Sequence, residues 1–335
     1  MSKSLSVGII GAGLMGHRRA DALKAVGGSR LVVASDVNKK TLGEFVEKYG
    51  CEAESDWQNL VQRKDIDVVI VAVPNKFIAP ITVLALKNNK HILVEKPLGR
   101  NPADSKKIIT AARTSRSVVK VGFNHRFHGA ISRAKEIFDK GEIGRLIFVR
   151  ARYGYGGRLG MEKEWRFQKD ISGGGELLDQ GVHVIDLARY FAGEFKKVYG
   201  AAESKFWKKG IDDNAFMILK NSQVTASMHV SATQWKNLFS FEVFGDKGFL
   251  DIYGKGGSYG RETLTFGKRK SKFGVPDIKI FSWDRDVSWE NEWRNFLGAI
   301  GKKNKINGNL SDGLAANKIV EAVYKSSKLG REIKL

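Results

Sequence analysis

A carboxylate and an imidazole stand four residues apart near the middle of the chain, in the segment GGGELLDQGVHVID at residues 173–186. On a helix this spacing places Asp179 and His183 on one face, where they form an acid/base pair. The preceding glycines expose bare backbone, which a flat ligand can approach closely. An ordinary buried histidine on an amphipathic helix is the alternative, because Leu178 and Val182 belong to an apolar side of the segment. The choice between these interpretations depends on the rest of the chain.

A lysine supplies the second candidate for chemistry. The tripeptide Glu95-Lys96-Pro97 ends an expected strand at residues 91–95, and the proline restricts Lys96 to an extended or turn conformation at the sheet edge. A cation beside a reacting oxygen would favour a developing alkoxide, or polarise a ketone in the reverse direction. A solvated surface lysine before a turn is the alternative.

The first residues predict a dinucleotide site. An apolar strand at residues 5–10 runs directly into the glycine motif GAGLMG and then a helical pattern that continues to residue 25. In this arrangement Gly11 permits a tight turn, Gly13 lets the backbone approach a pyrophosphate, and Gly16 lets the helix pack close to the strand. A structural glycine turn without a ligand is the alternative, but the order of strand, turn and helix favours nucleotide binding.

An acid at the end of the next strand indicates which cofactor binds. Asp36 follows an expected strand at residues 31–35, about 20 residues beyond the last glycine, where a carboxylate accepts hydrogen bonds from a ribose. A carboxylate there repels a 2′-phosphate and so favours NAD, although Lys39 and Lys40 leave NADP open. We expect cofactor contacts at Gly11, Gly13, Leu14, Met15, Gly16, Asp36, Val73, Pro74, Asn75, Glu95 and Lys96.

Strand and helix patterns alternate from residue 5 to residue 122, which predicts a parallel, doubly wound sheet. The pattern then changes to short strands with tight connections, expected at residues 197–206, 214–220, 223–232, 238–244 and 248–253. Helical patterns at 287–300 and 311–329 close the chain. We therefore expect an α/β Rossmann domain at residues 1–122 and a second α+β domain at residues 123–335, built on a mostly antiparallel open sheet.

Polar and aromatic residues near these elements are candidates for substrate binding. The side chains that follow the last parallel strand can hydrogen-bond the hydroxyls or an anionic group of a substrate. In a later glycine-rich loop, aromatic rings can pack on the face of a sugar and guanidinium groups can pair with a phosphate. The candidates, besides Lys96, Asp179 and His183, are Asn124, His125, Arg126, Tyr153, Arg158, Trp165, Arg166 and Trp235. Alternatively, the first group caps the domain junction and Trp235 lies in the core.

Composition limits the remaining options. The formal charge of +21 suits an anionic partner, but the densest basic run is only Lys268 to Lys272, so no nucleic-acid-binding arm is expected. The single cysteine, Cys51, forms no internal disulfide and belongs to no metal motif. No apolar run approaches the ~20 residues of a membrane span, and the first residues lack a signal-peptide layout. We expect a soluble, cytoplasmic protein without a metal.

GAGLMG at 11–16, EKP at 95–97 and the GGGxLLDxGxHxID pattern at 173–186 occur in the order typical of one family. Over essentially its whole length the chain resembles the glucose-fructose oxidoreductase, inositol dehydrogenase and rhizopine-catabolism family of NAD(P)-dependent oxidoreductases. The resemblance implies that Lys96, Asp179 and His183 are catalytic and that the Lys96–Pro97 peptide is cis. It also implies a homodimer or homotetramer formed through the outer face of the second-domain sheet.

The resemblance implies a dehydrogenase that acts on a secondary hydroxyl of a sugar. An imidazole with a pKa near 6.5 suits proton transfer, so we assign His183 as general acid/base, although Lys96 and His183 could exchange roles. The basic surface favours an activated or nucleotide-linked sugar. The alternatives are an inositol or polyol dehydrogenase, an NAD-dependent glycosidase, or a cofactor-sensing regulator without catalysis.

Overall fold

The computed structural model describes residues 4–207, 210–270 and 274–335, so part of the basic run Lys268 to Lys272 lies outside the described residues. The chain forms two compact units. The first contains residues up to Asn124 together with residues 289–314, and the second contains residues 125–288 and 315–335.

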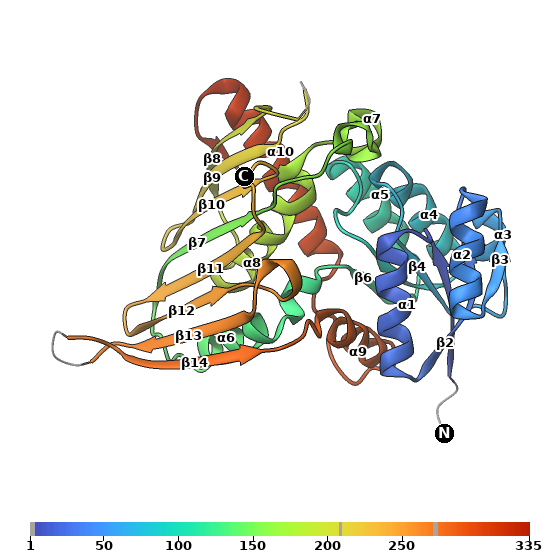
Figure 1. Cartoon of the computed structure of the whole chain (residues 1–335), viewed down its shortest axis with the longest axis horizontal. Coiled ribbons are helices and arrows are strands. Elements are labelled where there is room, and N and C mark those ends of the chain that lie inside the picture. Colours follow the sequence, from blue (N-terminus) through green and yellow to red (C-terminus); the bar gives the residue numbers. More distant parts are fainter. Residues whose placement is uncertain (1–3, 208–209, 271–273) are drawn as a thin grey trace. The chain divides into compact units, whose positions relative to one another are not determined.

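The first unit is built on a parallel six-stranded sheet with the order β3-β2-β1-β4-β5-β6 (Figure 1). This is the strand order of a Rossmann fold, so the predicted fold of this domain is confirmed. Its strands and helices are β1 (Leu5–Ile10), α1 (Leu14–Val26), β2 (Ser29–Ser35), α2 (Lys39–Tyr49), β3 (Glu52–Glu54), α3 (Trp57–Gln62), β4 (Val68–Val71), α4 (Asn75–Lys87), β5 (His91–Val94), α5 (Pro102–Ala112), β6 (Val119–Val121) and α9 (Ser288–Ile300).

Alternating residues of the central strands bury their side chains on opposite faces of this sheet. Val7 and Ile9 of β1 share one core with residues of α1 and α2, and α9 contributes Trp293 and Phe296 to the same core. Both α9 side chains are almost fully buried. The packing of these two aromatic residues explains why residues 289–314 belong to the first unit. From the sequence, all of residues 123–335 were instead assigned to the second domain.

The second unit contains a nine-stranded sheet with the order β14-β13-β12-β11-β7-β10-β9-β8-β15. Among the described strands of this sheet, only β7 and β10 pair in parallel, so the expected mostly antiparallel sheet is confirmed. Its strands are β7 (Leu146–Gly154), β8 (Lys197–Glu203), β9 (Asn214–Lys220), β10 (Thr225–Ser231), β11 (Leu238–Gly245), β12 (Gly248–Tyr253), β13 (Glu262–Lys268), β14 (Asp277–Trp283) and β15 (Ile333–Lys334).

Helices cover one face of this sheet (Figure 1). They are α6 (Gly129–Asp139), α8 (Val182–Ala192) and α10 (Leu310–Leu329), and the short α7 (Lys169–Ser172) lies near one end. The other face carries exposed apolar side chains, including Tyr199 and Phe216. Within the described residues, no helix combines the length and the apolar character required to cross a membrane.

The segment between α7 and α8 departs from the ordinary helix expected to follow the three glycines and to carry Asp179 and His183. Residues Leu177–Gly181 form a π-helical turn, and the α-helix begins only at Val182. Asp179 therefore lies on the π-turn and His183 in the first turn of α8. A π-turn contains more residues per turn than an α-helix and is frequent at functional sites.

Candidate active site

The glycine loop after β1 is shaped for close approach of a ligand. Gly11 has φ +99°, and a Cβ built there would lie 2.2 Å from the Ala72 carbonyl oxygen. A Cβ at Gly16 would lie 2.1 Å from the Gly11 carbonyl oxygen, whereas one at Gly13 would meet nothing within 4 Å. Gly11 and Gly16 are thus required by the protein's own packing, and the open space beside Gly13 fits a pyrophosphate at the start of α1.

Asp36, the residue predicted to bind a ribose, is held beside the glycine loop by two backbone N–H groups. Its Oδ2 accepts a hydrogen bond of 2.8 Å from the Ala12 backbone N–H, and its Oδ1 accepts one of 2.8 Å from the Asn38 N–H. These bonds fix the carboxylate beside the glycine loop and leave further lone pairs for a ligand hydroxyl. The strand order reverses between β1 and β4, and ligands of such sheets bind at this reversal. The chain leaves β4 there through Val73, Pro74 and Asn75. Together with the glycine loop and Asp36, this edge of the sheet fits NAD.

Glu95 is part of a buried ionic cluster. The Arg19 guanidinium lies 2.5 Å from the Glu95 carboxylate and 2.5 Å from the Glu292 carboxylate, and all three side chains are at least nine-tenths buried. The Lys120 ammonium, also buried, lies 3.8 Å from Glu292. This cluster fixes the end of β5, directly before the half-buried Lys96. The Lys96–Pro97 peptide is cis, as the family resemblance implied.

His183 is buried and stacks on a second imidazole. Its ring centroid lies 3.7 Å from that of His125, with an interplanar angle of 26°. His125 is also buried and contacts Tyr153, with ring centroids 5.3 Å apart. Both residues were among the predicted site candidates, and the Tyr153 ring centroid lies 6.4 Å from that of His183. The stack places one face of the His183 ring against His125.

Asp179 belongs to a chain of charged groups on the second unit. Its Oδ2 accepts a hydrogen bond of 3.3 Å from Arg166 Nε. Arg166 also lies 3.4 Å from Glu164, whose other oxygen lies 2.5 Å from the Arg158 guanidinium. The three predicted residues Asp179, Arg166 and Arg158 are thus brought together by Glu164, which the sequence analysis did not single out.

Tyrosines surround the carboxylates of this region. Burial, followed by the charges of Tyr259, Glu176 and Asp179, raises the pKa of Tyr153 well above its usual value. Burial raises the pKa of Tyr259 to about 12. These phenols stay protonated near neutral pH, so they act as hydrogen-bond donors and not as bases. Glu176 and Tyr259 were not predicted. Glu176 occupies a position that the GGGxLLDxGxHxID pattern leaves open, and Tyr259 belongs to none of the motifs.

Arg126 has a clear partner inside the second unit. Its Nε lies 2.7 Å from Asp186 Oδ2 and its Nη2 lies 2.6 Å from Asp186 Oδ1, and both side chains are buried. The guanidinium also lies over the Tyr190 ring at 4.7 Å. This bidentate ion pair joins the turn of residues 124–127 to α8 and so positions His125, which precedes Arg126 in the chain. Asn124, also buried, ends the first unit.

The two predicted tryptophans differ in their surroundings. The Arg166 guanidinium lies over the Trp165 ring at 4.7 Å, which places Trp165 beside the charged chain that ends at Asp179. Trp235 has φ +56° and is 62% exposed, and its ring packs edge-on against Phe206 with centroids 4.9 Å apart. The structure therefore does not support the alternative that Trp235 is a core residue.

Family models match both units of the chain. Residues 5–123 match the model described as an oxidoreductase family with an NAD-binding Rossmann fold. Residues 131–251 match the GFO/IDH/MocA C-terminal domain. The two matched ranges follow each other in the family order and together cover most of the sequence, and the first of them is an NAD-binding Rossmann domain.

Individual relatives are carbohydrate dehydrogenases. The chain is 36% identical to levoglucosan dehydrogenase of Pseudarthrobacter phenanthrenivorans over 208 residues, which is 58% of this chain and 53% of that protein. It is 28% identical to myo-inositol 2-dehydrogenase of Thermotoga maritima, over 73% of this chain and 74% of that protein. A solved levoglucosan dehydrogenase in complex with NADH and levoglucosan matches with a TM-score of 0.90 and 25% identity, over 99% of both chains. The match to the first relative thus spans about half of its length.

Proposed function

The chain belongs to the GFO/IDH/MocA family of oxidoreductases, and from this premise we propose that it moves a hydride between a nicotinamide cofactor and a secondary hydroxyl or ketone carbon of a carbohydrate. The observation that carries the proposal is the buried His183, stacked on His125 and close in sequence to the Arg166-bound Asp179. An imidazole held in one orientation suits general acid/base catalysis.

We assign the following roles in cofactor binding and catalysis to individual residues. Gly13 and the start of α1 would hold the pyrophosphate of NAD, and Asp36 its adenosine ribose. Bound NAD supplies the hydride acceptor. His183 takes the proton of the reacting hydroxyl at an imidazole nitrogen, and the Lys96 ammonium stabilises negative charge that develops on that oxygen. Asp179, held by Arg166, stabilises the positive imidazole.

The sugar is gripped by groups of the second unit. Tyr153 and Tyr259 remain protonated and present phenolic donors beside Asp179. Arg158, with its side chain 65% exposed, supplies a guanidinium that a phosphate can contact. Together with the net charge of +21, this supports an activated or nucleotide-linked sugar. The similarity to myo-inositol 2-dehydrogenase supports a second candidate, a free cyclitol.

A substrate panel tests the function. The protein, with NAD or NADP, is incubated with free sugars, anhydrosugars, cyclitols and nucleotide-linked sugars, and nicotinamide reduction is followed by absorbance. We expect at least one substrate whose ring carries a free secondary hydroxyl to reduce NAD. The same substrate should reduce NADP more slowly. Cleavage of a glycoside without net NADH would instead indicate an NAD-dependent glycosidase. No redox change with any carbohydrate, combined with tight binding to a protein partner, would indicate a regulator.

The outer face of the second-unit sheet supports self-association. Tyr199, Phe216 and Ile218 project from neighbouring strands β8 and β9 and are 49%, 51% and 39% exposed. On the same sheet the rings of Phe148, Phe244 and Phe249 stack in a row, with centroids 4.6 and 5.3 Å apart. A second copy of the chain would bury this apolar surface, so a homodimer or homotetramer forms part of the proposal.

A further inference from the structure

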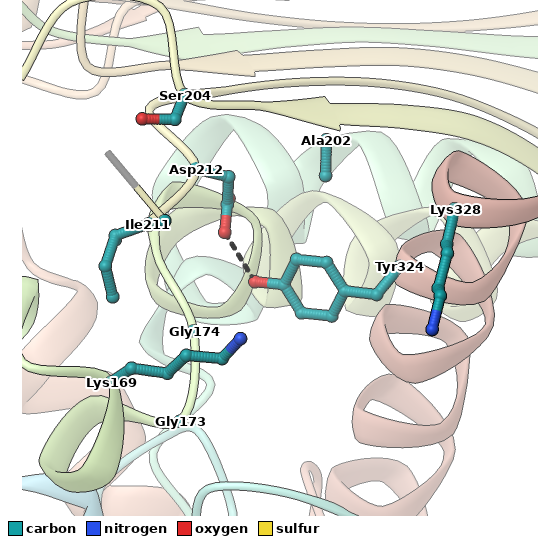
Figure 2. A pocket seen from close by; sticks show the side chains of 10 residues that line it. Lys169, Gly173, Gly174, Ala202, Ser204, Ile211, Asp212, Tyr324 and Lys328 are labelled. Atoms are coloured by element: carbon teal, nitrogen blue, oxygen red, sulfur yellow. Dashed lines mark hydrogen bonds between the residues drawn. The ribbon is translucent and has the colours of Figure 1, made fainter. Parts of the chain in front are cut away.

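A pocket in the second unit has no part in the reaction described above. Its volume is about 420 Å³, and it lies between α7, the chain after β8 and α10 (Figure 2). The ten residues that line it include neither Asp179 nor His183. This volume is within the range of small-molecule sites in proteins.

Two lysines give the pocket its positive charge. Lys169 enters from α7 and Lys328 from α10, and in Figure 2 their side chains lie on either side of Tyr324. Neither ammonium has an ion-pair partner within 4.0 Å among the described parts of the chain. Lysine is a common ligand of phosphate as a point charge, and two such groups match a dianion.

The one carboxylate among the lining residues, Asp212, is held by donors other than the two lysines. Asp212 accepts hydrogen bonds from the N–H groups of Gly175 at 2.9 Å and Leu177 at 2.7 Å. It also accepts one of 2.7 Å from the Tyr324 hydroxyl. These three bonds occupy both carboxylate oxygens, and within the described residues Asp212 forms no ion pair within 4.0 Å with Lys169 or Lys328.

Glycines keep the wall of the pocket open. A Cβ at Gly174 would lie 2.4 Å from the Tyr324 hydroxyl, and Gly173 has φ +85°. Both positions therefore favour glycine, and the pocket borders backbone and not bulky side chains there. The result is a preformed hollow with two cations at its edges and a phenol hydroxyl between them.

We infer that this hollow is a binding site for the phosphate group of a small molecule, separate from the reaction centre. The ammonium groups of Lys169 and Lys328 contact the phosphate oxygens, and the volume leaves room for a sugar-sized remainder. Free phosphate and a phosphorylated sugar share this chemistry, and the experiment below distinguishes them.

Binding is measured by isothermal titration calorimetry at constant ionic strength, with saturating NAD so that the nucleotide site is filled. The probes are inorganic phosphate, glucose 6-phosphate and unphosphorylated glucose. We expect one saturable site for inorganic phosphate. Tighter binding of glucose 6-phosphate would identify a phosphorylated metabolite as the ligand, and equal or weaker binding would identify phosphate itself. Lys169→Gln and Lys328→Gln should each weaken the binding about tenfold, because each removes one charge-assisted contact.

Lys325→Gln is the matched control, since Lys325 is an exposed lysine on α10 that does not line the pocket. It should leave the affinity unchanged, and all variants should keep the wild-type circular dichroism spectrum. The inference is overturned if no saturable binding occurs, if the double variant binds as tightly as wild type, or if Lys325→Gln weakens binding equally, which would show only general attraction to a basic surface.

Discussion

The imidazole rings of His125 and His183 stack with their centroids 3.7 Å apart and an angle of 26° between their planes. His125 is itself positioned by its neighbour Arg126, which is bonded through two nitrogens to Asp186 on α8. The same helix therefore carries His183 and, three residues later, the anchor of the residue that stacks on it. The second unit thus supplies both the imidazole of His183 and the ring that packs against it.

The first prediction concerns this stack. His125→Ala should lower kcat by about 10- to 100-fold, because a freed His183 ring samples unproductive orientations. His125→Phe retains an aromatic face and should stay within about threefold of wild type. The dissociation constant for NADH should not change in either variant. Steady-state kinetics and fluorescence titration with NADH measure these quantities. Equal kcat values for wild type and His125→Ala would show that the stack has no catalytic consequence.

The second prediction concerns stability. Asp186→Ala leaves the buried Arg126 charge without its partner and should lower the free energy of unfolding by about 3–5 kcal/mol, measured by urea denaturation. The double variant Arg126→Met, Asp186→Ala should recover part of that loss. Glu332→Gln serves as control, because it removes only the half-exposed pair with Lys197 and should cost at most about 1 kcal/mol. A similar small loss for Asp186→Ala would contradict the structural role given to this pair.

The third prediction concerns pH. Burial alone would raise the pKa of Asp213, but the backbone N–H groups of Lys205, Phe206 and Trp207 donate to its carboxylate and hold that pKa below its usual value. A lowered folded-state pKa adds stability that is complete above the ordinary Asp pKa of about 3.9 and is lost as the pH falls through the folded value.

Asp213→Asn should therefore lower the free energy of unfolding by about 1–2 kcal/mol at pH 7, and its stability should fall less steeply than that of wild type below about pH 4. Urea denaturation at a series of pH values measures both effects. Asp284→Asn, at a carboxylate that is 87% exposed, is the control and should follow the wild-type curve. An Asp213→Asn curve parallel to wild type would argue against the lowered pKa.

The fourth prediction concerns self-association. Ile218→Glu places a charge in the exposed apolar surface of β9 and should shift the protein to monomers, as measured by light scattering after size-exclusion chromatography. Val37→Glu is the control, because Val37 is 93% exposed and lies on the first unit. A monomeric wild-type protein, or an Ile218→Glu variant with the wild-type mass, would remove this surface from the proposal.

Local patterns predicted the first unit better than the end of the second. The bounds expected for β1, β9 and β12 match the structure, because each of these strands has a distinct apolar pattern and clear turn residues. The strands β13 and β14 were not expected. Glu262, which begins β13, is buried because it bonds to the distant His128, and β14 is an edge strand whose residues are mostly exposed. Such strands are defined by their partners and not by their own pattern.

In the candidate site too, local motifs were predicted and contacts between distant residues were not. Spacing identified Asp179 and His183, and the glycine motif identified the loop beside Asp36. The sequence could not indicate that Arg19 pairs with both Glu95 and Glu292, because Glu292 lies 273 positions further along the chain. The π-turn at Leu177–Gly181 was also not expected, since its residues favour an ordinary helix as strongly.

The role of His183 is the central claim, and its replacement tests that claim most directly. The measurement is the rate of nicotinamide absorbance change with the best substrate of the panel, for wild type and His183→Ala, alongside NADH affinity. We predict a fall in turnover of about 10²–10⁴-fold with unchanged NADH affinity, because proton transfer from the hydroxyl loses its base. Wild-type turnover in His183→Ala would contradict the account and remove this imidazole from the reaction.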